Sequence, residues 1–227
     1  MRKSPSLEAL IPVLYLKGIS TGDFQEALEA ILGPNAAGLS ATTVVRLKEI
    51  RRREYETWRK RDLKGKHDVY IWADGIYFNA RLDEERSSIL VLMGATADGR
   101  KELIAVHDGY RESKRSRQEL LGSLKDRGLR RAPHVAVGDG ALGFWAALRE
   151  VFPNTREQRC WVHKTANILD KMPKSVQSKA KTAIHEMYRA ETKQQALKAY
   201  GRFIRLYKAK YPAACECLTK DIDVLFI

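Results

Sequence analysis

Residues 69–75 read Val-Tyr-Ile-Trp-Ala-Asp-Gly, and residues 135–140 read Val-Ala-Val-Gly-Asp-Gly. Each stretch is a short apolar run, typical of a buried strand, that closes on an Asp-Gly pair. If the two strands belong to one sheet, the carboxylates of Asp74 and Asp139 can face each other where the runs end. The two stretches therefore predict a sheet with a pair of acids at one edge.

Such a pair of acids indicates a metal site. Two unit charges about 4 Å apart repel by roughly 4 kcal/mol at an effective dielectric constant of about 20. A shared proton, a Lys or Arg, or a divalent cation can offset this repulsion, and Mg²⁺ prefers a few carboxylates together with phosphate oxygens. The alternative is that either Asp merely starts a turn, as we expect of Asp98-Gly99 between the strand-like runs 88–95 and 101–107.

Length and composition predict an ordinary globular chain. Its 227 residues, 44% of them hydrophobic, can form one full domain plus a small one. No apolar stretch reaches the roughly 18 residues of a membrane span, and the start does not look like a signal peptide. We therefore expect a protein that stays inside the cell and has no membrane partner. Its three cysteines form no disulfide framework and are expected to be reduced.

The formal net charge of +13 indicates a polyanionic partner, with nucleic acid first among the candidates. Lys and Arg outnumber Asp and Glu in residues 40–66 and again in residues 170–220, on both flanks of the acidic pair. Solvated helix faces that serve only solubility are the alternative.

Residues 1–66 have helical periodicity and are expected to form a region of their own. Two short helices would be followed by a third that begins after Ser40. This pattern is compatible with a helix-turn-helix that reads DNA, although a helical bundle packed on the next domain fits equally well. The candidate DNA-binding residues on the third helix are Thr42, Thr43, Arg46, Arg51, Arg52 and Arg53.

From residue 67 the periodicity changes to that of strands. Beyond residues 69–75, the pattern predicts strands at 76–82, 88–95, 103–106, 135–138 and 155–160. Helices are expected after the capping-box pattern Ser116-x-x-Glu119 and over residues 141–151. Only helices are expected from about residue 161 onward. This order predicts a mixed α/β sheet with helices on its faces.

Hairpin strands followed by helix, strand, helix and strand is the ribonuclease-H-like arrangement. Within it, three blocks resemble the catalytic core of the bacterial Mutator-type insertion-sequence transposases: residues 72–77, 138–141 and 158–167. Residues 17–21 and 127–129 fit the same family. The resemblance covers essentially the whole chain, and the joint order and spacing of the blocks is more specific than any one of them.

The resemblance implies an Asp-Asp-Glu recombinase in which three carboxylates hold two Mg²⁺ or Mn²⁺ ions. Asp74 and Asp139 match the first two catalytic acids. The third acid, a Glu beyond an inserted helical domain, has no match here. The resemblance thus implies a helical region at 1–66, an incomplete ribonuclease-H-like core at 67–170 and the start of a helical insertion at 171–227. We expect this chain alone not to cleave DNA.

The block around Cys160 and His163 allows more than one interpretation. Cys-x-x-His is half of a zinc site, which Cys215 and Cys217 would have to complete, but a Cys-x-Cys pair is tight for tetrahedral ligation. Because the family has this block near its active site, Cys160 and His163 are expected to support the site or to touch DNA. Residues that flank the same sheet edge could support the site or hold backbone phosphates, and the candidates are Arg156, Arg159 and Lys164.

The leading hypothesis is a DNA transposase whose partners are double-stranded DNA, as terminal inverted repeats and target DNA, and a second copy of itself. The expected location is the bacterial cytoplasm, in association with the nucleoid. One alternative is a truncated, non-catalytic transposase that binds transposon ends or inhibits the intact enzyme. Another is a structure-directed nuclease of the same fold.

Overall fold

The computed structural model describes residues 26, 29–30, 41–78, 87–109, 114–140 and 142–227. The chain divides into two compact units, which are considered separately below: residues 1–62 with 80–84, and residues 63–79 with 85–227. The two helices expected before residue 40 lie almost entirely outside the described residues.

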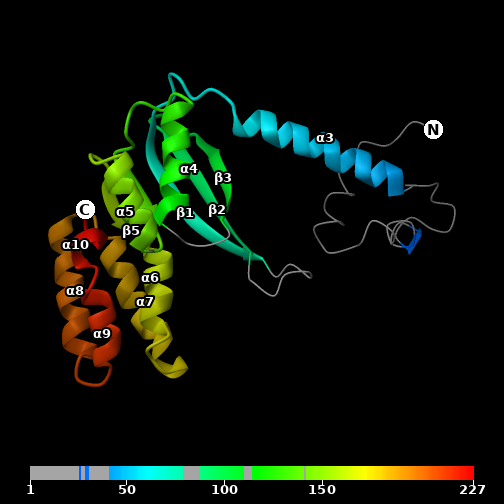
Figure 1. Cartoon of the computed structure of the whole chain (residues 1–227). Coiled ribbons are helices and arrows are strands. Elements are labelled where there is room, and N and C mark those ends of the chain that lie inside the picture. Colours follow the sequence, from blue (N-terminus) through cyan, green and yellow to red (C-terminus); the bar gives the residue numbers. More distant parts are fainter. Residues whose placement is uncertain (1–25, 27–28, 31–40, 79–86, 110–113, 141) are drawn as a thin grey trace. The chain divides into compact units, whose positions relative to one another are not determined.

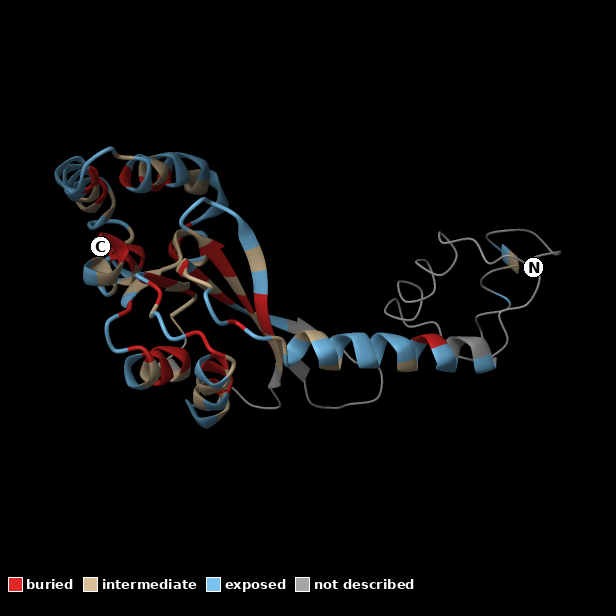
Figure 2. Cartoon of the chain, turned by 90° about the horizontal axis from the view of Figure 1, so that it is seen from above, coloured by how far each residue is buried: buried red, intermediate tan, exposed pale blue. Residues whose placement is uncertain are grey.

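The described part of the first unit is essentially one long helix, α3, which spans Ala41–Arg59 (Figure 1). It begins after Ser40, as predicted. Where burial is described, its side chains are mostly exposed (Figure 2), and Leu47 is buried. Long Arg and Glu side chains along this surface pair at helical spacings of three and four residues.

The second unit is built on a five-stranded sheet with strand order β3-β2-β1-β4-β5 (Figure 1). Strands β1, β2 and β3 form an antiparallel meander, and β4 and β5 then add in parallel beside β1. This is the predicted ribonuclease-H-like mixed sheet. The strands are β1 (Asp68–Phe78), β2 (Ser87–Thr96), β3 (Lys101–Gly109), β4 (Val135–Gly138) and β5 (Arg156–Arg159).

Two local expectations about strands have different outcomes. The turn at Asp98-Gly99 is confirmed: Gly99 has a φ of 83°, and the amide of Thr96 donates to the carbonyl of Arg100 at 3.0 Å. The prediction that one strand ends at Asp74-Gly75 and another begins at residue 76 is wrong, because β1 continues through both residues. The reason is tertiary, since β1 keeps pairing with β2 beyond Asp74 while its pairing with β4 ends at Ala73.

Helices α4 (Lys114–Asp126) and α5 (Leu142–Val151) share a hydrophobic core with the sheet. Their buried side chains, such as Leu121 and Leu148, meet Ile71 and Leu92 of the central strands. Helix α4 begins at Lys114, so the expected capping box at Ser116 is wrong: Ser116 already lies inside the helix. The chain leaves α4 through Gly128, whose φ of 101° suits glycine.

Only helices follow β5, as predicted, and they surround a second hydrophobic core that includes Ile184 and Phe203 (Figure 1). Thr192 caps α8 by accepting a hydrogen bond from the amide of Gln195 at 3.2 Å. Among the described residues, no helix is both long and apolar enough to cross a membrane. The helices are α6 (Trp161–Leu169), α7 (Lys174–Tyr188), α8 (Lys193–Tyr207), α9 (Pro212–Thr219) and α10 (Ile222–Leu225).

Candidate active site

The two candidate acids occupy equivalent positions on neighbouring strands. In the parallel pair of β1 and β4, Ala73 is in register with Gly138; Asp74 is the next residue on β1, and Asp139 is the first residue after β4. Equivalent residues of parallel neighbours project from the same face, and adjacent strands lie about 4.8 Å apart. Asp74, within its strand, and Asp139, just after the end of one, therefore directly follow a register pair of adjacent strands. That their carboxylates face each other stays a prediction.

The face of the sheet from which Asp74 projects is opposite the face packed by α4 and α5. Side chains alternate along β1: Ile71 and Ala73 are buried in the core shared with these helices, whereas Asp74 is exposed. The Asp74 side chain keeps 57% of its surface accessible. A carboxylate so placed can bind a ligand from solvent without any rearrangement of the core.

His163 joins Asp74 from helix α6. Its Nε2 lies 3.7 Å from Asp74 Oδ1, which is an ion-pair distance when the imidazole is protonated and too long for a direct hydrogen bond. The Nδ1 atom of His163 is buried and has no hydrogen-bond partner in the described part of the chain. The Cys-x-x-His block therefore does reach the acid pair, and His163 is the member that does so.

Cys160 positions the start of α6 through its backbone. Its amide donates to the carbonyl of Gly138 at 2.8 Å, one residue before Asp139, and its carbonyl accepts from the amide of Lys164. Its half-buried thiol makes no capping hydrogen bond. Since Cys215 is buried in the helical core, it contributes to packing there.

Arg159 and Lys164 share one carboxylate, that of Asp221. The Lys164 Nζ donates to Asp221 Oδ2 at 2.7 Å, and Arg159 Nε lies 3.3 Å from the same oxygen. The side chains of Lys164 and Arg159 are only 3% and 11% exposed. This burial fits a supporting role in the site better than direct contact with backbone phosphates, the other role expected for them.

Asp221 was not singled out from the sequence. It lies 57 residues after Lys164, beyond three helices, and nothing in local periodicity relates the two positions. Its contribution depends on how α10 returns to β5, where the Gln158 amide group donates to the carbonyl of Leu225 at 3.1 Å. Only the tertiary structure shows that Asp221 contacts Lys164 and Arg159.

The donor set fits a hard divalent cation in part. Mg²⁺ is commonly held by one or two carboxylates, with water and phosphate oxygens completing its shell. Asp74 and Asp139 supply two such carboxylates, whereas an imidazole such as that of His163 suits other metals better. The described residues contain no group of three His, Cys, Asp or Glu side chains placed to hold an ion. The two aspartates can therefore begin a Mg²⁺ or Mn²⁺ site but supply only part of its ligands.

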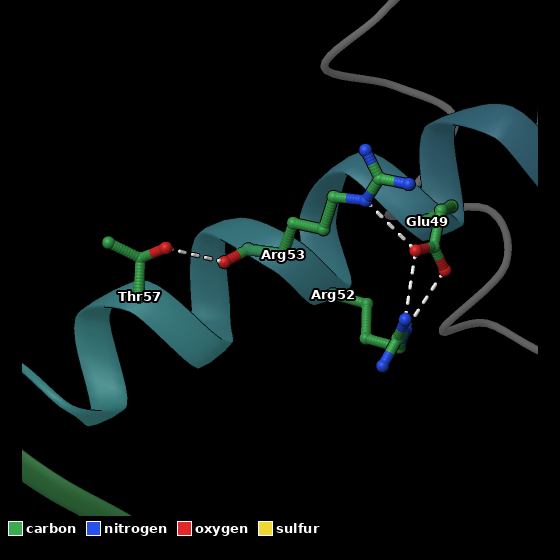
Figure 3. A network of polar contacts seen from close by, with 4 residues as sticks. All are labelled: Glu49, Arg52, Arg53 and Thr57. Atoms are coloured by element: carbon green, nitrogen blue, oxygen red, sulfur yellow. Dashed lines mark hydrogen bonds and ion pairs between the residues drawn. The ribbon is translucent and has the colours of Figure 1, made fainter.

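The arginines of α3 are largely paired with acids of the same helix (Figure 3). Glu49 accepts from Arg52 at 2.9 Å and from Arg53 at 3.0 Å, and these hydrogen bonds lower the pKa of Glu49 to about 2. Arg51 pairs with Glu54 at 2.7 Å. These pairs are exposed, so they are weak and leave the arginines open to exchange partners.

Among the remaining candidate DNA-binding residues on α3, the exposure of Thr42 and Arg46 is described. Thr42 and Arg46 are exposed, and Arg46 makes no ion pair with another described residue. Thr43 belongs to α3, but its side chain lies outside the described part of the structure.

The similarity of this chain to known proteins covers nearly its whole sequence. The family described as Transposase, Mutator family matches residues 1–226. The transposase for insertion sequence element IS6120 of Mycolicibacterium smegmatis is 50% identical over 219 residues, which cover 96% of this chain and 67% of that protein. The transposase for insertion sequence element IST2 of Acidithiobacillus ferrooxidans is 48% identical over 197 residues, 87% of this chain and 67% of that protein.

The chain covers a smaller share of its more distant relatives. The transposase for insertion sequence element IS256 in transposon Tn4001 of Staphylococcus aureus is 28% identical over 230 residues, which cover 99% of this chain and 58% of that protein. A cryo-EM structure of a simian T-cell lymphotropic virus intasome with PP2A regulatory subunit B56 gamma aligns at 14% identity over 85% of this chain and 59% of that chain. Its TM-score of 0.28 is too low to support an argument. By the match along its full length and its identity to the first two relatives, the chain belongs to the Mutator family of transposases.

Proposed function

We propose that this chain carries the first part of the catalytic centre of an insertion-sequence transposase, which cuts and joins DNA with divalent cations. The observation that supports the proposal is the register of the neighbouring strands β1 and β4, in which Ala73 pairs with Gly138 and the candidate acids Asp74 and Asp139 are the next residues of the chain. We assign residues 1–66 to DNA binding, 67–170 to an incomplete catalytic core and 171–227 to the start of a helical insertion.

Each residue of the site has a distinct task in this proposal. Asp74 and Asp139 hold two Mg²⁺ or Mn²⁺ ions together with a third acid that has no match in residues 1–227. When bound, such ions activate the attacking oxygen and stabilise the leaving oxygen of a phosphodiester. His163 keeps the Asp74 carboxylate in place, and the backbone of Cys160 fixes the start of α6 beside the strand that leads to Asp139.

The DNA partner in this proposal is a terminal inverted repeat and, later in the reaction, target DNA, with two copies of the protein at work. The exposed arginines of α3 support phosphate binding, because their glutamate partners are on the surface and can be exchanged for phosphate oxygens. Such contacts release counterions, so binding should weaken steeply as salt rises.

A Mn²⁺ titration tests the ion site without requiring catalysis. Free Mn²⁺ would be measured by electron paramagnetic resonance in the wild type and in the variants Asp74→Asn and Asp139→Asn. Asp170→Asn is the matched control, because Asp170 is an exposed acid outside the site. We expect each site variant to bind Mn²⁺ at least about tenfold more weakly than the wild type, and the control to be unchanged.

A DNA titration completes the test. A fluorescent duplex that carries a terminal inverted repeat should bind the chain with an affinity that falls as salt rises. DNA binding without any Mn²⁺ binding at the acid pair would refute the catalytic assignment and favour a non-catalytic, DNA-binding transposase remnant. Equal Mn²⁺ affinity in the wild type and in both Asp→Asn variants would refute the proposed ion site.

A further inference from the structure

A buried cluster of two cations and one acid lies beside the acid pair. Asp221 is 23% exposed and its Oδ2 faces both Lys164 Nζ and Arg159 Nε. Because a buried cation without a counter-charge is strongly unfavourable, a single carboxylate that serves two of them is difficult to replace. In the sequence, Arg159 immediately precedes and Lys164 immediately follows the Cys160–His163 block, whose His163 contacts Asp74.

The Arg159 guanidinium lies directly over the turn that follows Asp139. A Cβ atom added to Gly140 would fall 2.0 Å from Arg159 Nη1 and 2.5 Å from its Cζ. Gly140 has a φ of 90°, which glycine adopts without strain. The missing side chain at Gly140 thus leaves the room that the guanidinium occupies.

Within the described part of the chain, hydrogen bonds do not hold this guanidinium. Its Nε and Nη1 atoms are buried and have no hydrogen-bond partner among the described residues. The contacts that remain are packing against Gly140 and the charge of Asp221 at 3.3 Å. Among the described residues, Asp221 is the acid that forms an ion pair with Arg159.

The segment that carries Asp221 is anchored on both sides of the site. On β5, the Gln158 side chain donates to the carbonyl of Leu225 at 3.1 Å. On α6, the ring of Trp161 meets that of Phe226 with centroids 5.4 Å apart. The segment 221–226 thus joins β5, which leads into Cys160, to the first turn of α6, which carries His163.

We propose that Asp221 is a positioning residue of the catalytic centre: it holds the Arg159 guanidinium against the Asp139-Gly140 turn and thereby fixes the second acid of the pair. Asp221 itself holds no ion. The part of this proposal that concerns ion affinity rests on the proposed function, whereas the part that concerns Arg159 does not. Changes to groups that orient a metal ligand commonly cost about 10- to 100-fold in affinity.

Two measurements on variants of the 227-residue chain test the proposal. The first is solvent exchange of the Arg159 Nε proton, followed by NMR on ¹⁵N-labelled protein, with the resonance assigned by its loss in Arg159→Lys. The second is the Mn²⁺ titration described above. Asp221→Asn should accelerate the proton exchange and weaken Mn²⁺ binding about tenfold. Asp223→Asn, the same change at an exposed acid on α10, should alter neither.

A double variant separates positioning from simple charge balance. Asp221→Asn combined with Lys164→Met removes one anion and one buried cation, which protects the fold against an uncompensated charge. We expect it to remain folded and still to show fast Arg159 exchange and weak Mn²⁺ binding. If the double variant regains wild-type exchange and affinity, Asp221 only neutralises Lys164 and the proposal is wrong.

The same data distinguish failure of this proposal from failure of the proposed function. Mn²⁺ binding that is insensitive to Asp74→Asn refutes the ion site, while the exchange of the Arg159 proton still decides whether Asp221 holds Arg159. Slow exchange in Asp221→Asn refutes the positioning role, whatever the ions do. Fast exchange together with unchanged Mn²⁺ affinity also refutes it, because the turn at Asp139 would then not depend on Arg159.

Discussion

Replacement of Gly140 by alanine is the most direct test of how tightly the turn after Asp139 is built. The residue has a φ of 90°, and left-handed backbone costs a residue with a side chain roughly 1–2 kcal/mol. In addition, the new methyl group would meet the Arg159 guanidinium at 2.0 Å. Moving that side chain off its preferred rotamer costs about 0.5–1.5 kcal/mol. We therefore expect Gly140→Ala to lower the free energy of unfolding by about 2–3 kcal/mol.

Urea unfolding followed by tryptophan fluorescence measures this change as a shift of the midpoint at constant slope. Gly201→Ala is the control, because a methyl group at Gly201 meets nothing within 4 Å and the residue lies inside α8. Alanine there should stabilise the protein by up to about 1 kcal/mol through helix propensity. The double variant Gly140→Ala with Arg159→Ala should recover the steric part of the loss. A loss below about 0.5 kcal/mol in Gly140→Ala would refute this account of the turn.

Three further predictions concern other parts of the chain. Residues 1–227 alone should give no strand transfer with Mg²⁺ or Mn²⁺ in an end-joining assay, and transfer that disappears in Asp139→Ala would contradict this expectation. Hydrogen bonds from Arg52 and Arg53 lower the pKa of Glu49 from 4.5 to about 2. These hydrogen bonds should therefore stabilise α3 fully above about pH 4.5, and the stabilisation should be lost as the pH falls through about 2. An NMR titration of the Glu49 carboxyl group with a midpoint near 4.5 would disprove this prediction. Burial raises the pKa of the Cys215 thiol, so iodoacetamide at pH 8 should modify Cys215 more slowly than the less buried Cys217. Mass spectrometry of the digested protein measures both rates. Faster modification of Cys215 would show that its thiol is not packed in the helical core.

Local patterns were sufficient for most of the sheet and for the helices that follow it. Apolar runs closed by turn residues predicted β2 to β4, β5 was expected at 155–160 although its residues are polar, and helical periodicity predicted α3 and α5. Two short-range signals were misleading. Asp74-Gly75 has the composition of a turn, and Ser116-x-x-Glu119 that of a helix start, but pairing of β1 with β2 and an earlier start of α4 prevailed. In β1, strand pairing outweighs a local turn preference.

The candidate site was predictable only as far as its residues lie in recognisable blocks. The register that pairs Ala73 with Gly138, the residues before the two candidate acids, agrees with the ribonuclease-H-like arrangement expected from the sequence. The contact of His163 with Asp74 depends on the exact start of α6, and the role of Asp221 depends on the return of α10 to β5. Such contacts between distant segments leave no periodic signal in one sequence.

The central claim is that Asp74 and Asp139 together bind a divalent cation. The most direct measurement is a crystal structure of the chain with Mn²⁺, with the ion located by its anomalous scattering. We expect an anomalous peak about 2.0–2.2 Å from a carboxylate oxygen of each aspartate, the distance range of hard octahedral cations. An ion bound elsewhere, or carboxylates of Asp74 and Asp139 that no single ion can bridge, would contradict the account.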